Sequence, residues 1–130
     1  MGAMRPRSLV LDSGALIALE RAEGRIRALL DLGTRGRALI VVPVGVIAQV
    51  WRGGARQARI ARLLSSPSIT VEALHEEDAR ACGVLCGRAK TADVIDASLV
   101  VSALRHRAII VTSDVADIRR LDTTVAIEKI

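Results

Sequence analysis

Short aliphatic runs alternate along this chain with stretches of helical periodicity, and this alternation constrains the fold more than any other feature. Strands are predicted at residues 8–12, 38–42, 69–74, 108–112 and 125–130. Helices are predicted at residues 15–20, 25–35, 44–51, 56–64, 76–89, 92–107 and 115–121. Strands that are apolar on both faces and alternate with helices are typical of a parallel sheet covered on both sides. The pattern therefore predicts an α/β fold with right-handed crossovers.

The size and the residue composition favour one compact domain spanning residues 1–130. A chain of 130 residues fits a single hydrophobic core. It contains no Phe, no Tyr and one Trp, so Leu, Val, Ile and Ala must build that core. The same composition excludes RNA-binding modules that stack bases on aromatic side chains. Residues 1–7 are expected to form an N-terminal extension, whose first four residues resemble a cloning remnant.

The charge balance favours polyanionic or acidic partners. The chain has 19 basic and 14 acidic residues, a net charge of +5. Arg carries nearly all of the positive charge, because Lys90 and Lys129 are the only lysines. No apolar run approaches the roughly 18 residues of a membrane span, and no signal-peptide pattern opens the chain. The sequence therefore predicts a cytoplasmic protein without a membrane segment.

Acidic residues stand where open parallel sheets bind ligands, beyond the carboxyl ends of strands near a switch in strand order. Asp12 ends the first predicted strand, and Asp114 follows the fourth. Asp93 and Asp96 are three residues apart at the start of the long helix, so they share one helix face. A crossover helix beside the first strand would bring that face to Asp12. Each of these carboxylates has an alternative interpretation as a helix cap or a first-turn acid.

Converging carboxylates without His or Cys form a site of hard oxygen ligands, which selects Mg²⁺ or Mn²⁺ over zinc. Repulsion between the like charges would raise the pKa of at least one carboxyl group, and a divalent cation would remove that repulsion. Such a metal orients the nucleophile and stabilises charge on phosphate oxygens. The chemistry that this site supports is therefore phosphoryl transfer to water.

Three segments, in this order and spacing, resemble the motifs of the PIN-domain family. They are the strand and turn LVLDS at residues 9–13, the helix start ADVIDAS at 92–98, and the strand end IVTSD at 110–114. Within that family, the small size is similar to VapC-type toxins of toxin–antitoxin pairs. The resemblance covers residues 8 to about 121 and implies a three-layer α/β/α fold around a parallel sheet of about five strands. It also implies a Mg²⁺- or Mn²⁺-dependent endoribonuclease that acts on RNA, forms a homodimer and is inhibited by a cognate antitoxin protein.

The resemblance assigns a role to each acidic residue of the candidate site. Asp12 matches the first acid of the family, Asp96 the acid in the long helix, and Asp114 the acid after the fourth strand. These three are the expected catalytic residues and metal ligands. Asp93 matches an additional acid seen in some members, and Asp117 lies where a further, more variable one occurs. Both are further candidate metal ligands.

Gln49 departs from the family pattern and leaves two functions open. The family usually has a Glu in the helix after the second strand, where this chain has Gln49. An amide oxygen can ligate a metal or hold a metal-bound water, but it carries no charge, so cation affinity is expected to be lower. The alternative function is therefore a catalytically weakened PIN module that binds RNA or a partner protein without cleaving.

Two other enzyme classes with an Asp after a strand fit less well. A haloacid-dehalogenase-like phosphatase needs a second Asp two residues after the first, and this chain has Gly14 there. A phospho-accepting receiver would have its acceptor after the third strand and a Lys late in the fold, and neither is placed in this sequence.

A series of arginines recurs at intervals of three or four residues, namely Arg52, Arg56, Arg59 and Arg62. They lie opposite the apolar side of the predicted helix at 56–64, and a solvated helix face needs no partner. The functional interpretation is a phosphate-binding edge or a docking surface for an acidic antitoxin tail, because the guanidinium fork suits phosphate and carboxylate groups. The expected RNA-binding residues are Arg52, Arg56, Ser13 and Thr112.

Overall fold

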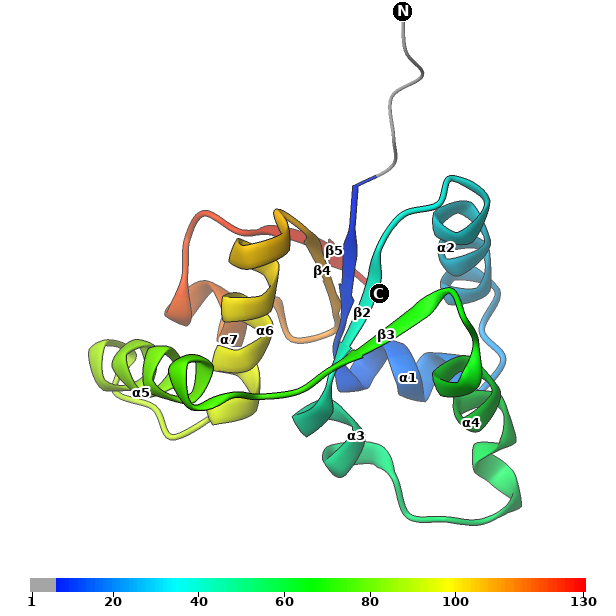
Figure 1. The fold of residues 1–130 in the computed structure, drawn as a ribbon, viewed down its shortest axis with the longest axis horizontal. Helices are drawn as coiled ribbons and strands as arrows, with labels where there is room; N and C mark the ends of the chain where they lie inside the picture. Colours follow the sequence, from blue (N-terminus) through cyan, green and yellow to red (C-terminus); the bar gives the residue numbers. More distant parts are fainter. Residues whose placement is uncertain (1–6) are drawn as a thin grey trace, which may run out of the picture.

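The computed structural model describes residues 7–130, which form a five-stranded parallel sheet flanked by helices (Figure 1). The strands are β1 (Leu9–Leu11), β2 (Ile40–Pro43), β3 (Ile69–Glu72), β4 (Ile109–Thr112) and β5 (Ala126–Lys129). Their order in the sheet is β3-β2-β1-β4-β5, and every neighbouring pair is parallel. The predicted α/β fold with about five strands is confirmed. The expected N-terminal extension, except for Arg7, lies outside the described residues.

Helices cover both faces of the sheet and give three layers. They are α1 (Ser13–Glu20), α2 (Gly24–Arg35), α3 (Val44–Val50), α4 (Ala58–Ser65), α5 (Glu76–Ala89), α6 (Val94–His106) and α7 (Val115–Leu121). Figure 1 shows α5, α6 and α7 on one side of the sheet and α1, α2 and α4 on the other. Within residues 7–130, no helix has the length and apolar character that crossing a membrane requires.

The core is aliphatic, as the composition requires. The central strands β1 and β2 are buried along their whole length, and β4 is buried except at its first residue. Leu16 of α1 packs from one side of the sheet and Leu99 of α6 is equally buried in the same core. The edge strand β3 is only partly buried, in agreement with its alternating apolar and polar residues.

The strand order reverses at β1, and this reversal creates a crevice. From β1 the chain runs to β2 and then to β3 on one side, whereas α5 and α6 lead back to β4 on the other side of β1. Ligands of open parallel sheets bind outside the carboxyl ends of the strands at such a switch point. Asp12 follows β1 and Thr112 ends β4, so both lie at this crevice.

The segment between α3 and α4 is held by a buried glutamine. Gln57 Oε1 accepts hydrogen bonds from the backbone N–H groups of Arg52 at 2.8 Å and Gly53 at 3.0 Å, and its Nε2 donates to the Val50 carbonyl at 2.6 Å. Gly53 has a φ of 75°, a left-handed conformation that favours glycine. These bonds fix the turn, and α4 therefore begins only at Ala58.

The late start of α4 corrects the predicted start of this helix at residue 56. Arg56 lies in a short 3-10 helix, Ala55–Gln57, and Arg52 lies in the loop after α3. Only Arg59 and Arg62 belong to α4. The four arginines are exposed, but they do not form a continuous helix face, because the glycine turn separates Arg52 from the others and Arg56 precedes α4.

Candidate active site

Asp12 is held at the carboxyl end of β1 by two hydrogen-bond donors, one from the residue that follows it and one from the end of β4. Its side chain is 1% exposed. Oδ1 accepts a hydrogen bond from the Ser13 backbone N–H at 2.6 Å, and Oδ2 accepts one from the Thr112 hydroxyl at 2.6 Å. The Thr112 oxygen in turn accepts from the Asp114 backbone N–H at 2.9 Å. This chain of bonds ties the carboxylate to the end of β4.

Thr112 positions Asp12 in this structure, and its contact with RNA stays a prediction. Thr112 is fully buried, and its hydroxyl hydrogen is donated to the Asp12 carboxylate. Ser13 is partly buried at the start of α1. Its RNA-binding role stays a prediction. The spacing of Thr112 and Asp114 gave no indication of the contact with Asp12, which lies 100 residues away in the sequence.

Thr112→Val is expected to lower the free energy of unfolding by about 1 to 3 kcal/mol, because a buried carboxylate loses a hydrogen-bond donor at nearly constant side-chain volume. Thr112→Ser keeps the hydroxyl and should lose less. Urea unfolding of the two variants and the parent measures the difference. A Val variant at least as stable as the Ser variant would contradict the positioning role.

Asp96 and Asp93 lie together at the start of α6. Asp93 is the N-cap, and its Oδ1 accepts a hydrogen bond from the Asp96 backbone N–H at 3.0 Å, which confirms the capping interpretation for Asp93. Asp96 is 8% exposed. Its burial, together with the charges of Asp93, Asp12 and Asp117 and a hydrogen bond with Asp93, raises the pKa of the Asp96 carboxyl to about 7. The structure therefore brings Asp96 within electrostatic range of Asp12.

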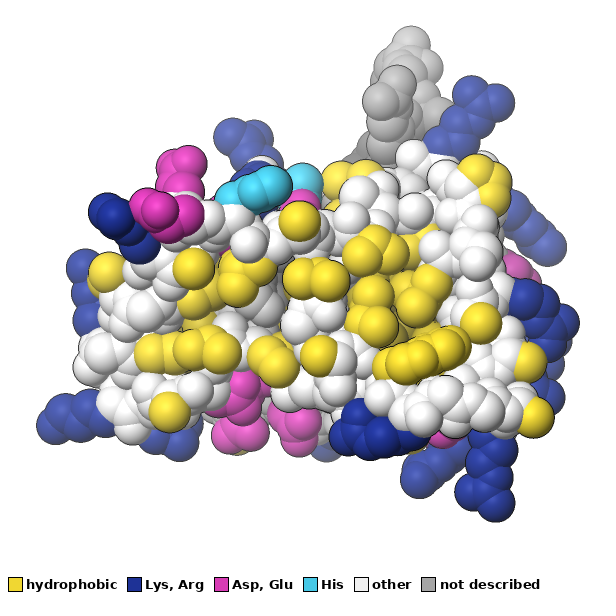
Figure 2. Space-filling model, turned by 60° about the horizontal axis from the view of Figure 1, so that its bottom comes forward, with side chains coloured by type: hydrophobic (Ala, Val, Ile, Leu, Met, Phe, Trp, Pro, Cys, Tyr) yellow, Lys and Arg dark blue, Asp and Glu magenta, His cyan; other side chains and the backbone are white. Residues whose placement is uncertain are grey.

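An acidic cavity of about 100 Å³ lies beside these residues. Its walls are Thr91, Asp93, Asp96, Asp117, Arg120 and Leu121. Figure 2 shows acidic side chains gathered below a band of hydrophobic ones on this view of the molecule. The sequence analysis placed Asp117 among the candidate ligands but missed Arg120. Its only local signal is a spacing of three residues from Asp117 on one helix.

The residues of this site fit a divalent cation in donor type and in charge. Asp12, Asp93 and Asp96 offer carboxylate oxygens, and their mutual repulsion is what a bound cation would remove. No Arg or Lys forms an ion pair with them in the described part of the chain. Across residues 7–130, no group of three or more acidic, His or Cys side chains is arranged so that it could hold a metal ion by itself. Water and substrate oxygens would therefore complete the coordination, as is usual for Mg²⁺.

Comparison with protein families identifies the domain. Residues 9–124 match the family model described as the PIN domain. The chain belongs to the PIN domain family. The match spans the three segments on which the resemblance was based, and the recognition is confirmed. Comparison with curated protein sequences gives no significant match.

Several solved structures share the fold of this PIN domain. VapBC2 from Rickettsia felis, bound to a DNA fragment from its promoter, aligns with a TM-score of 0.73 at 14% identity, covering 94% of this chain and 98% of that one. A toxin–antitoxin complex from Klebsiella pneumoniae aligns with a TM-score of 0.71 at 16% identity, covering 95% and 100%. FitAcB from Neisseria gonorrhoeae aligns with a TM-score of 0.65 at 19% identity, covering 92% and 95%. At these identities the likeness establishes the fold.

In this PIN domain, Gln49 lies on an exposed position of α3. One turn earlier on the same helix face, Gly45 lies so close to α6 that a Cβ there would be 3.2 Å from Ile95 Cγ1. Ile95 directly precedes Asp96. The face of α3 that carries Gly45 is thus turned toward the start of α6, and the assignment of Gln49 to the second acid position stays a prediction.

Asp114 and Asp117 lie at the exposed side of the site. Both side chains are exposed, on α7 or at its start. Asp114 is the N-cap of α7, but its carboxylate makes no capping hydrogen bond. The carboxylate of Asp114 is therefore available to another ligand, whereas a capping role is not supported.

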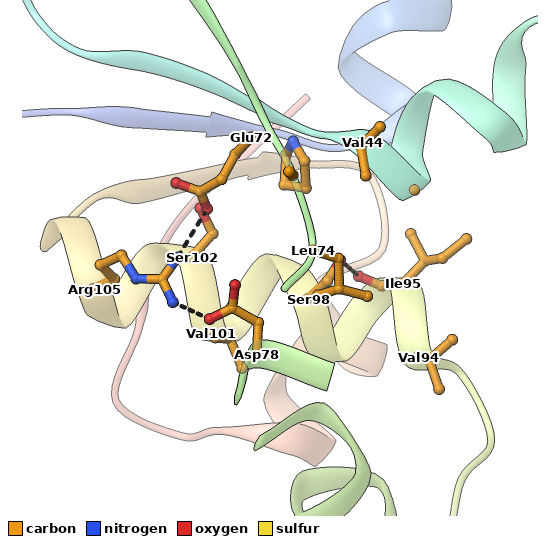
Figure 3. A pocket seen from close by; sticks show the side chains of 13 residues that line it. Val44, Glu72, Leu74, Asp78, Val94, Ile95, Ser98, Val101, Ser102 and Arg105 are labelled. Atoms are coloured by element: carbon orange, nitrogen blue, oxygen red, sulfur yellow. Dashed lines mark hydrogen bonds and ion pairs between the residues drawn. The ribbon is translucent and has the colours of Figure 1, made fainter. Parts of the chain in front are cut away.

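A second cavity, of about 50 Å³, lies between β3 and α6 and is mostly apolar (Figure 3). Arg105 of α6 reaches Glu72 of β3 at 3.6 Å and also pairs with Asp78 of α5. His106 contacts the same Glu72. These pairs join three elements at the side of the sheet, and none of them belongs to the acidic site.

Proposed function

We propose that this PIN domain is a metal-dependent endoribonuclease that cleaves RNA phosphodiester bonds, and that it is the toxin of a toxin–antitoxin pair. The proposal is carried by the electrostatic interaction between Asp96 and Asp12, which lies at the switch point of the sheet. Both carboxylates are buried, and the charge of Asp12 contributes to the raised pKa of Asp96. Two buried carboxylates that form no ion pair with Arg or Lys in the described part of the chain favour a bound cation.

The proposed ligands of Mg²⁺ or Mn²⁺ are Asp12, Asp96 and Asp114, with Asp93, Gln49 and Asp117 as further candidates. When bound, the metal supplies a Lewis acid that activates water and stabilises charge on the phosphate. Asp12 is held in place by Ser13 and Thr112. Asp96 would lose its proton as the cation binds, so cation affinity should increase with pH.

The activity is tested by incubating the purified chain with single-stranded RNA in Mg²⁺, in Mn²⁺ and in chelator. The expected result is cleavage in the presence of either cation and none in chelator, because the metal activates the water that attacks the phosphate. Cleavage that persists in chelator would contradict the proposed mechanism.

A catalytically weakened module that binds RNA or a partner without cleaving is the alternative. The observation that favours it is Gln49, which supplies no charge to the site. Retained RNA binding without cleavage in either cation would support this alternative and overturn the nuclease proposal.

The proposed protein partner is a cognate antitoxin, and both proteins would be cytoplasmic. One structural relative is described as a toxin–antitoxin complex, and another, VapBC2, is bound to a DNA fragment from its promoter. An open groove beside α1 and α4 offers a surface for such a partner, with Leu19 and Leu63 as apolar contacts and Arg27, Arg59 and Arg62 along it. This combination favours an acidic amphipathic segment.

A homodimer is the proposed assembly, formed through the apolar surface near the second cavity. Val44, Leu74 and Val94 line that cavity and are 43%, 46% and 52% exposed. Figure 2 shows a band of hydrophobic side chains across one face of the molecule. Exposed apolar patches of this kind mark protein interfaces. Light scattering of the purified chain measures the oligomeric state.

A further inference from the structure

Arg120 is a positive charge placed in a cavity with acidic walls. It lies on α7 and lines the cavity together with Asp93, Asp96 and Asp117. Within residues 7–130, its guanidinium makes no ion pair and no hydrogen bond. Asp117 is three residues earlier on the same helix and still does not pair with it. The fold thus leaves the donors of Arg120 free.

The neighbouring Arg119 shows what a structural arginine does on this helix. Its Nη1 donates a hydrogen bond to the Val125 carbonyl at 2.6 Å and so connects α7 to the start of β5. Arg119 also helps to keep the pKa of Asp122 low, together with hydrogen bonds from the following turn that outweigh burial. Arg120 has neither kind of contact, so packing of α7 does not account for it.

An arginine at this place lowers the attraction of the site for a cation. The charges of Asp93, Asp12 and Asp117 act against that of Asp96. The guanidinium of Arg120 lines the same cavity, and a positive charge there opposes the entry of a metal ion. The same carboxylates also repel an anionic RNA strand. A guanidinium fork offers paired donors that match two phosphate oxygens, and it stays charged at any physiological pH.

We propose that Arg120 binds a phosphate group of the RNA strand at the mouth of the acidic cavity. This inference rests on the proposed nuclease function and adds a substrate-binding residue to it. Arg120 holds the non-bridging oxygens of one phosphate, while the carboxylates remain available to the cation. Its position at the acidic cavity makes that phosphate either the scissile one or its neighbour in the strand.

The proposal is tested by RNA binding, measured as fluorescence anisotropy of a labelled single-stranded RNA in Mg²⁺. Asp96→Asn is compared with Asp96→Asn/Arg120→Ala, so that cleavage does not interfere. The expected loss of affinity on removing Arg120 is about 10- to 100-fold, the effect of one charged hydrogen-bonded contact. The slope of log affinity against log salt should become less negative by about 0.7, one phosphate contact on a single strand. Arg120→Lys should restore the slope but only part of the affinity.

Arg35→Ala is the matched control. Arg35 is exposed at the end of α2, just before β2, and therefore lies toward the amino ends of the strands, whereas Asp12 lies at their carboxyl ends. Its removal takes away the same charge and should leave the affinity nearly unchanged. Equal affinity and equal salt slope for the Arg120 and Arg35 variants would overturn the proposal, even where the parent cleaves RNA.

Two further outcomes separate this inference from the proposed function. If neither Asp96→Asn nor the double variant binds RNA, the Arg120 proposal is overturned, while cleavage by the parent keeps the nuclease function. If Arg120→Ala lowers Tm in chelator as much as Arg119→Ala, Arg120 serves the fold and the proposal is overturned. The expected result is a lower Tm for Arg119→Ala alone, since that variant loses its bond to Val125.

Discussion

Asp96→Asn is expected to reduce metal-dependent RNA cleavage by about 10³-fold or more, since a metal contributes several kcal/mol of transition-state stabilisation. The substitution removes one charge and almost no volume. Asp96 is buried at the start of α6, and its backbone N–H, which Asp93 caps, is unaffected. The variant should therefore fold. Initial rates of RNA cleavage in Mg²⁺ and in Mn²⁺ measure the effect.

The same variant should be more stable than the parent in chelator, by about 1 to 3 kcal/mol near pH 8, because it no longer buries a charged carboxylate and relieves the repulsion by the neighbouring acids. The folded protein raises the pKa of Asp96 from 3.8 to about 7, so the folded state binds the proton more tightly than the unfolded chain. The stability of the metal-free parent therefore falls as pH rises from about 4 to about 7, and Asp96→Asn removes this dependence. Urea unfolding in chelator at about pH 5 and about pH 8 measures both effects.

Asp31→Asn is the matched control, because Asp31 is exposed on α2 and undergoes the same chemical change. It should leave cleavage and the pH dependence of stability unchanged. Retained metal-dependent cleavage by Asp96→Asn would show that Asp96 only stabilises the start of α6 and takes no part in catalysis. A variant that is less stable than the parent in chelator at about pH 8 would show that Asp96 is not repelled by its neighbours.

Gln49→Glu is expected to tighten Mg²⁺ or Mn²⁺ binding by about tenfold or more, because it adds a charged hard ligand of nearly the same size. Less metal should then be needed for RNA cleavage. In chelator the variant should be less stable than the parent, since a further negative charge joins the acidic cluster. Calorimetric titration of Mn²⁺ and thermal melts in chelator and in excess Mn²⁺ test the two effects together.

Gln49→Ala separates the added charge from the loss of the amide. It has no side-chain oxygen, and it should bind the cation no better than the parent. If Gln49→Glu binds Mn²⁺ like the parent and melts identically in chelator, the side chain does not face the acidic cluster. That result would contradict the placement of Gln49 at the second acid position.

Local patterns were enough to predict the helices and strands of this protein. Periodicity and burial on both faces are properties of neighbouring residues, and the structure differs from the predicted elements mainly at their ends. The start of α4 is the clearest case. Gln57 binds the Arg52 and Gly53 backbones and moves the first helical residue to Ala58, and a propensity argument does not contain such a side-chain contact.

The candidate site was predictable in its chemistry but not in its partners. Asp12 and Asp96 could be named as candidate site residues from the sequence, because local structure determines where a carboxylate after a strand or at a helix start lies. The positioning role of Thr112 could not be predicted from the sequence, because its hydroxyl donates to a carboxylate 100 residues away in the chain. Arg120 was missed for a similar reason. Its neighbour in sequence, Arg119, is chemically identical, and only the packing of α7 decides which of the two lines the acidic cavity.

The sequence by itself determined the element types, the aliphatic core, the family and the hard-oxygen character of the site, since these follow from residue type and short-range spacing. The tertiary structure alone decided the strand order β3-β2-β1-β4-β5. That order places the carboxyl ends of β1 and β4 side by side and brings Asp96 to Asp12. The physical reason is that strand neighbours and buried charges are selected by contacts between residues far apart in the chain. Those contacts contribute to stability only when the sheet and its helices have packed together.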